Sequence, residues 1–193
     1  MEEDMDDIID RSKKPPRGYY PAYNFEDFDQ WERGWEMMDG FPWMRNPNME
    51  EDEERIARLI GRRFLEVLGN DRFQIILPIY NEVSDLMAMQ PDLVLLRLPI
   101  ANKGQYLTHA ELVLHFQWET SIEDGIDPRP IVYAALEIPY YVAINPIAKR
   151  IIIRQLEKGE WQLKAKGHVD EFTFQIEGKA IHIDFKSMWA DAE

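Results

Sequence analysis

Asp92 and His115 are the two residues whose types and spacing could support catalysis. Asp92 opens the apolar run 93–98, which predicts a short strand. His115 lies in residues 107–118, where apolar and polar side chains alternate as they do on a strand with two different faces. If the two strands are neighbours, Asp92 and His115 point at one spot, with Gln117 further along. An aspartate and a second ligand can hold Mg²⁺, whose bound water then attacks a phosphodiester.

The same alternation has a simpler interpretation. Residues 109–119 place polar side chains on every second position, as the solvent face of an antiparallel strand does. On that interpretation His115 has no chemical role. Spacing alone leaves both interpretations open.

Composition excludes several other kinds of site. The 193 residues contain no cysteine, which rules out disulfides, thiol nucleophiles and iron–sulfur clusters. There is no glycine-rich phosphate loop, and the four histidines do not have the spacing of zinc ligands. The net charge of −14 repels nucleic acid at long range, so contact with DNA would need metal ions or a local basic patch.

The predicted elements alternate between helices and strands. Asn48 can cap a helix that Gly69 ends, with acids in its first turn and apolar residues at helical spacing. A short helix is expected near 25–33 and another near 131–136, and Asp39-Gly40 predicts the turn of a hairpin. Strands are expected at 35–44 (the hairpin), 73–79, 93–98, 107–118 and 140–144, followed by a meander at 151–156, 161–165, 171–176 and 180–185.

These elements predict an α+β fold with a mixed or mostly antiparallel sheet, flanked by one long and one short helix. Residues 1–24 read as an acidic, flexible arm, with six acids in the first ten positions, and residues 25–193 as a single domain. We expect a cytoplasmic protein, because the start lacks the features of a signal peptide and no apolar run is long enough to span a membrane.

Four segments follow one another along the chain: 36–40 (Glu-Met-Met-Asp-Gly), 90–94 (Gln-Pro-Asp-Leu-Val), 133–146 and 151–189. In this order they resemble the Uma-two family of restriction-endonuclease-like proteins, in the PD-(D/E)XK nuclease superfamily. The first segment is similar to the family's hairpin, and the second to its Pro-Asp strand. The segment 133–146 is similar to the family's strand that ends in Asp-Pro, and residues 151–189 to its closing meander. The resemblance covers about residues 30–190 and implies a restriction-endonuclease-like core.

The resemblance also implies a site, which this chain has altered. Asp92 matches the family's catalytic aspartate, whereas His115 stands where the family has a glutamate and Arg129 where it has a lysine. The implied catalytic set is thus Asp92, His115 and Arg129, with Asp92 and His115 as ligands of Mg²⁺ or Mn²⁺, if any metal is bound. Histidine is a poor Mg²⁺ ligand, and arginine cannot act as a general base. Glu111 or Glu119 could substitute for the missing carboxylate.

Two functions therefore compete. The first is a metal-dependent DNA endonuclease with an altered site that is either active or inactive. The second is a non-catalytic relative that binds a protein partner through the acidic, aromatic residues 1–35. A two-fold homodimer is the default expectation for the assembly state.

Overall fold

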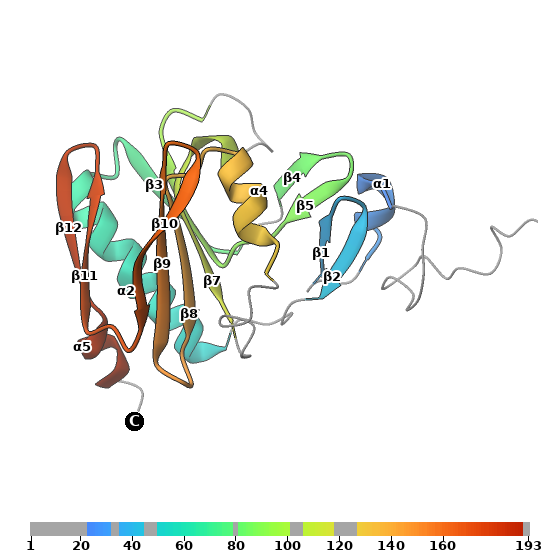
Figure 1. Cartoon of the computed structure of the whole chain (residues 1–193). Coiled ribbons are helices and arrows are strands. Elements are labelled where there is room, and N and C mark those ends of the chain that lie inside the picture. Colours follow the sequence, from blue (N-terminus) through green and yellow to red (C-terminus); the bar gives the residue numbers. More distant parts are fainter. Residues whose placement is uncertain are drawn as a thin grey trace, which may run out of the picture. The chain divides into compact units, whose positions relative to one another are not determined.

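A computed structural model describes residues 23–31, 35–44, 50–78, 81–100, 106–117 and 127–190. The chain divides into two compact units, and Figure 1 colours both along the sequence. The smaller unit is made of residues 1–48 and 80–90, and the larger one of residues 49–79 and 91–193. Most of the predicted arm, residues 1–22, lies outside the described residues.

The smaller unit is a four-stranded sheet with an aromatic core. Its strands β1 (Trp35–Met38), β2 (Phe41–Met44), β4 (Asn81–Ser84) and β5 (Met87–Met89) lie in the order β2-β1-β5-β4. Asp39 and Gly40 both adopt positive φ, at 53° and 72°, so the predicted hairpin turn is confirmed. The helix α1 (Phe25–Phe28) is shorter than expected, and the sequence analysis missed β4 and β5.

The long helix of the larger unit, α2 (Glu51–Leu68), has the predicted amphipathic character. Its N-cap is Glu50, whose backbone N–H donates to the Glu53 carboxylate at 2.9 Å. The predicted cap, Asn48, is therefore wrong, and it lies outside the described residues. Gly69 ends the helix with φ of 93°, as expected.

A six-stranded sheet forms the centre of the larger unit (Figure 1). Its order is β10-β9-β8-β7-β6-β3, and only the pairing of β7 with β8 is parallel. The residues between those two strands include the helix α4 (Arg129–Ala135), and the 3-10 turn η2 (Tyr106–His109) leads into β7. The strands are β3 (Phe73–Ile76), β6 (Leu93–Arg97), β7 (Ala110–Phe116), β8 (Tyr140–Asn145), β9 (Arg150–Glu157) and β10 (Glu160–Gly167).

One face of this sheet carries the main apolar core. The helix α2 packs there together with the hairpin of β11 (Glu171–Ile176) and β12 (Lys179–Asp184), which the helix α5 (Phe185–Ala190) follows. The hairpin is a separate two-stranded sheet, so the prediction of one continuous closing meander is wrong. The fold class is α+β with a mostly antiparallel sheet, as predicted. Within the described residues, no helix is both long and apolar enough to cross a membrane.

Phe174 joins the separate hairpin to the core. Its ring lies 5.2 Å from that of Phe64 on α2 and 5.3 Å from that of Tyr140 on β8, centroid to centroid, and it is 1% exposed. Phe174→Ala should therefore lower the free energy of unfolding by about 3–5 kcal/mol, measured by urea denaturation. Thr173→Ala, at the exposed neighbouring position, is the control and should change it by less than about 0.5 kcal/mol. Equal effects of the two changes would contradict this packing.

Candidate functional site

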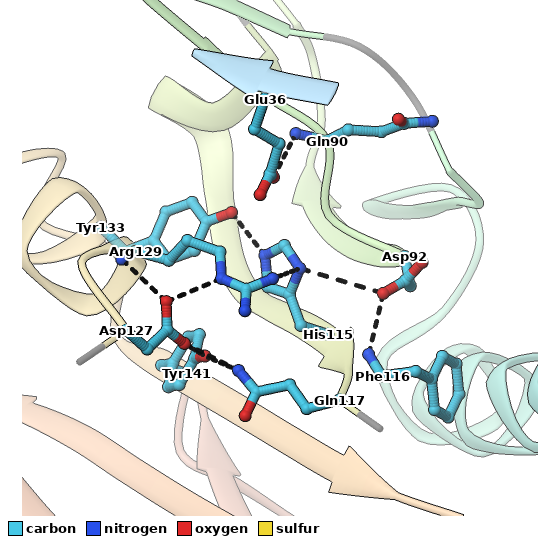
Figure 2. Close-up of polar contacts among 10 residues, drawn as sticks. All are labelled: Glu36, Gln90, Asp92, His115, Phe116, Gln117, Asp127, Arg129, Tyr133 and Tyr141. Carbon is cyan, nitrogen blue, oxygen red and sulfur yellow. Dashed lines mark hydrogen bonds and ion pairs between the residues drawn. The ribbon is translucent and has the colours of Figure 1, made fainter. Parts of the chain in front are cut away.

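The sheet brings Asp92 and His115 together, as the sequence analysis predicted. Asp92 directly precedes β6, whose first residue Leu93 pairs with Leu114 of β7, and the Asp92 N–H donates to the Leu114 carbonyl at 2.9 Å, so Asp92 lies beside His115. Both residues alternate with side chains that face α2, which places them on the opposite face of the sheet. Asp92 Oδ2 lies 3.9 Å from His115 Nδ1 and accepts the Phe116 backbone N–H at 2.8 Å (Figure 2).

His115 does not lie on a solvent face. The strand β7 is flanked by β6 and β8, and both faces of it are covered: Leu114 and His115 are each 0% exposed. The interpretation as an exposed strand face is therefore wrong at Val113, His115 and Gln117, which are all buried, and residues 118–119 lie outside the described residues. A buried polar side chain must find hydrogen-bond partners inside the protein.

Arg129 supplies one of those partners. Its NH1 nitrogen lies 3.2 Å from His115 Nδ1, and because a guanidinium has only donors, the ring nitrogen accepts. The neutral imidazole then carries its proton on Nε2, which lies 2.6 Å from the Tyr133 hydroxyl and donates to it. The structure thus brings together all three predicted residues, Asp92, His115 and Arg129 (Figure 2).

Asp127 holds the guanidinium in this position. Its Oδ1 accepts from Arg129 Nε at 2.8 Å and from the Arg129 backbone N–H at 3.1 Å. Its Oδ2 accepts from the Tyr141 hydroxyl at 2.6 Å and from Gln117 Nε2 at 2.7 Å. Both oxygens are therefore occupied by strong donors, one of them charged. We call Asp92, His115, Gln117, Asp127, Arg129, Tyr133 and Tyr141 the buried polar cluster.

The proton positions in the cluster follow from burial and charge. Burial alone raises the pKa of Asp127, but the charge of Arg129 and the hydrogen bonds from Arg129 and Tyr141 outweigh it, so this pKa lies below its ordinary value. Burial, together with the negative charge of Asp127, raises the pKa of Tyr141 well above its ordinary value. At neutral pH Asp127 is thus an anion, and Tyr141 is a proton donor.

Two tyrosine rings enclose His115 and limit access to it. Tyr133, on α4, stacks on the imidazole with centroids 5.6 Å apart, and Tyr141, on β8, lies 6.1 Å from it. Trp161 covers the far side of Tyr141 and donates to the Pro130 carbonyl at 2.7 Å. Aromatic side chains therefore fill the space beside the histidine.

The cluster is a poor fit for a divalent metal ion. His115 Nδ1 faces Asp92 but already accepts from Arg129, and a guanidinium at that distance repels a second cation. Within the described ranges, no three His, Asp or Glu side chains are grouped to hold a metal. The proposed substitute Glu111 forms an ion pair with Arg97, and Glu119 lies outside the described residues.

The sequence analysis missed Asp127, Tyr133 and Tyr141 as members of the cluster. Tyr141 lies inside an apolar run that reads as an ordinary buried strand. Asp127 had a weak signal, since an acid two residues before an arginine at a helix start can hold that arginine's backbone and side chain together. A single sequence does not reveal which buried positions such a pair would meet.

Comparison with known proteins supports the fold. Neither a scan against protein-family models nor a search of curated proteins finds a match. One similar solved structure, from Anabaena variabilis ATCC 29413, is described as a "putative nuclease belonging to DUF820". It matches with a TM-score of 0.62 at 12% identity, covering 86% of this chain and 97% of that chain. At this identity the likeness shows the fold alone, which the two chains share.

Replacing the carboxylate of Asp127 should reduce the loss of free energy of unfolding that occurs at low pH. Because the pKa of Asp127 is lower in the folded than in the unfolded state, its contribution is complete above the unfolded value, about 3.9, and is lost as the pH falls through the folded value. Asp127→Asn should therefore cost on the order of 3 kcal/mol at pH 7 and progressively less below about pH 4. Urea unfolding at pH 7, 5 and about 3.5 measures this difference.

The matched control is Asp127→Asn in a protein whose Arg129 has been replaced by methionine. In an Arg129→Met background, Asp127→Asn should cost much less at pH 7, because the carboxylate has already lost its charged donor. A cost that is the same at every pH, or unchanged in the Arg129→Met background, would contradict the ion pair as the source of the stabilisation.

Proposed function

We propose that this chain is a non-catalytic protein with a nuclease-like fold, which acts by binding a partner. The hydrogen bond from Arg129 NH1 to His115 Nδ1, at 3.2 Å, is the observation that carries the proposal. It places a cation of the protein itself on the ring nitrogen that faces Asp92, which is where the family resemblance implies a metal ion. Arginine remains charged at any working pH, so this cation cannot be removed by titration.

The ion pair with Asp127 also makes this arrangement costly to open. Arg129 is 8% exposed, and its removal from Asp127 would leave a buried carboxylate without its charged donor. Such uncompensated charges typically cost about 3–5 kcal/mol. A metal ion at His115 that displaced the whole guanidinium from Asp127 would have to supply that energy as well as its own desolvation.

The charge of the whole chain supports a partner other than nucleic acid. A net charge of −14 disfavours approach to DNA, whereas it suits a partner with a basic surface. The acids and aromatics of residues 1–35 are the proposed contact region for a protein partner.

A metal-dependent endonuclease is the second candidate. Asp92 and His115 lie on neighbouring strands with 3.9 Å between Oδ2 and Nδ1, which favours a shared ligand more than sequence spacing alone did. In that case Asp92 and His115 would hold Mg²⁺ or Mn²⁺, and Arg129 would stabilise the charge that develops on a DNA phosphate. The guanidinium would first have to leave His115.

A metal titration followed by thermal unfolding separates the two candidates. For the wild type we expect no stabilisation by millimolar Mg²⁺ or Mn²⁺ that depends on Asp92, so the shift should be the same in Asp92→Ala. For His115→Glu combined with Arg129→Lys, we expect Mn²⁺ to stabilise the fold, by about 1.4 kcal/mol at a tenfold excess over the dissociation constant. Adding Asp92→Ala to that double variant should abolish the gain.

DNA cleavage by the same four proteins is the second readout. An Asp92-dependent metal shift or Asp92-dependent cleavage in the wild type would overturn the non-catalytic proposal and favour the endonuclease. Cleavage by the double variant but not by the wild type would agree with a nuclease-like site that the chain's own His115 and Arg129 keep inactive.

If the chain acts by binding a partner, that binding should require the arm and should not require Asp92. Cross-linking of the native full chain in its own cell extract should give a defined adduct, which deletion of residues 1–22 removes and Asp92→Ala leaves unchanged. An adduct that survives the deletion would exclude residues 1–22 as the contact.

A further inference from the structure

The hairpin of β9 and β10 is a basic element in an acidic chain. Residues 149–168 hold six lysines and arginines against two acids, whereas the whole chain has a net charge of −14. At physiological salt, exposed charges more than about 8 Å away are largely screened. A short ligand at the hairpin therefore responds mainly to the local positive charge, although the chain as a whole repels anions.

Cross-strand pairing shows which side chains of the hairpin share a face. Arg154 pairs with Tyr141 of β8 on one side and with Leu163 of β10 on the other, so all three project from the face that carries the buried polar cluster. Lys166 belongs to the same face, because its row of paired residues across the sheet leads to His115. Two cations and an aliphatic side chain therefore share one surface.

Neither of these cations is neutralised by an ion pair. Among the residues that the structure describes, no acid forms an ion pair with the half-buried Arg154 or the exposed Lys166. The two acids of the hairpin, Glu157 and Glu160, lie opposite each other on the side that faces α2, and Lys164 forms an ion pair with Glu157 there. An anionic ligand at Arg154 and Lys166 would therefore displace no ion pair.

Exposed aliphatic side chains accompany the two cations. Leu163 is 57% exposed, and Ile131 on α4 is 74% exposed. Trp161 connects the two positions, because it lies two residues before Leu163 on β10 and donates through Nε1 to the carbonyl of Pro130, the residue before Ile131, at 2.7 Å. Exposed apolar groups gathered in one region commonly mark a contact with another molecule. We call Ile131, Arg154, Leu163 and Lys166 the basic face.

We propose that the basic face binds an extended acidic segment of a protein partner, with aliphatic side chains among its acids. The carboxylates of the segment pair with Arg154 and Lys166, and its aliphatic side chains cover Leu163 and Ile131. This contact goes beyond the proposed role of the arm, and it requires neither the arm nor catalysis.

The apolar part of the basic face selects a peptide over a nucleic acid. Proteins bind unpaired bases by stacking them on aromatic rings, whereas Leu163 and Ile131 offer aliphatic groups. The ring of Trp161 is already packed on Tyr141, with centroids 6.2 Å apart, and is held by its hydrogen bond to Pro130. A phosphate backbone also carries one charge per nucleotide, so a chain of net charge −14 repels it more than it repels a short peptide.

The test is the binding of a fluorescent peptide of alternating glutamate and leucine to the full chain, measured by fluorescence anisotropy. We expect a dissociation constant on the order of 10–100 µM. Arg154→Glu and Lys166→Glu should each weaken binding at least about fivefold, and Leu163→Ser at least about threefold. Lys166 and Leu163 are exposed, so their variants still test the proposal if circular dichroism shows that Arg154→Glu does not fold.

The matched control is Lys164→Glu, which reverses a lysine of the same strand on the side that faces α2, and it should leave peptide binding unchanged. No binding up to about 1 mM peptide, or equal weakening by Lys164→Glu and Lys166→Glu, would overturn the proposal. Tighter binding of a thymidine oligonucleotide, lost in the same variants, would overturn it in favour of a nucleic-acid site. Peptide binding that appears only after deletion of residues 1–22 would overturn it in favour of the chain's own arm as the occupant.

Discussion

The burial of the Arg129 charge is the constraint on which the rest of the site depends. A guanidinium that is 8% exposed needs an anion and further hydrogen-bond acceptors, and Asp127 and His115 supply them. Asp127 in turn needs donors for its second oxygen, and Tyr141 and Gln117 provide them. Each partner is therefore fixed by the one before it, and the proton on His115 has only one position compatible with the set.

Backbone pairing makes this arrangement possible. The strand β7 lies in the middle of the sheet, antiparallel to β6 and parallel to β8, so the neighbours of His115 come from both sides of it. The parallel pairing requires a crossover, and the helix α4 in that crossover carries Arg129 and Tyr133 to the same face of the sheet. This fold accommodates a buried arginine because it already brings these elements together.

Local signals were enough to predict part of this structure. The acidic first turn, the apolar residues at helical spacing and Gly69 identified α2, and Asp39-Gly40 identified the hairpin. The spacing of Asp92 and His115 allowed neighbouring strands, and the structure has them side by side. The rest depends on contacts that are distant in sequence. The strand β5 pairs with β1 across some fifty residues, β11 and β12 leave the main sheet, and β7 is covered on both faces despite its alternation. Whether the predicted residues bind metal or react stays a prediction.

A buried ion pair and a solvent-exposed ion pair have different effects on the stability of this protein. The pair of Asp127 and Arg129 is buried, so removing either partner would leave the other as an unpaired charge inside the protein. The pair is therefore held in one conformation. On the outer face of α2, Arg58 and Glu54 form an ion pair whose side chains are exposed to solvent, so breaking that pair costs little. The first pair therefore fixes the interior and its proton positions, whereas the second contributes little to the stability of the fold.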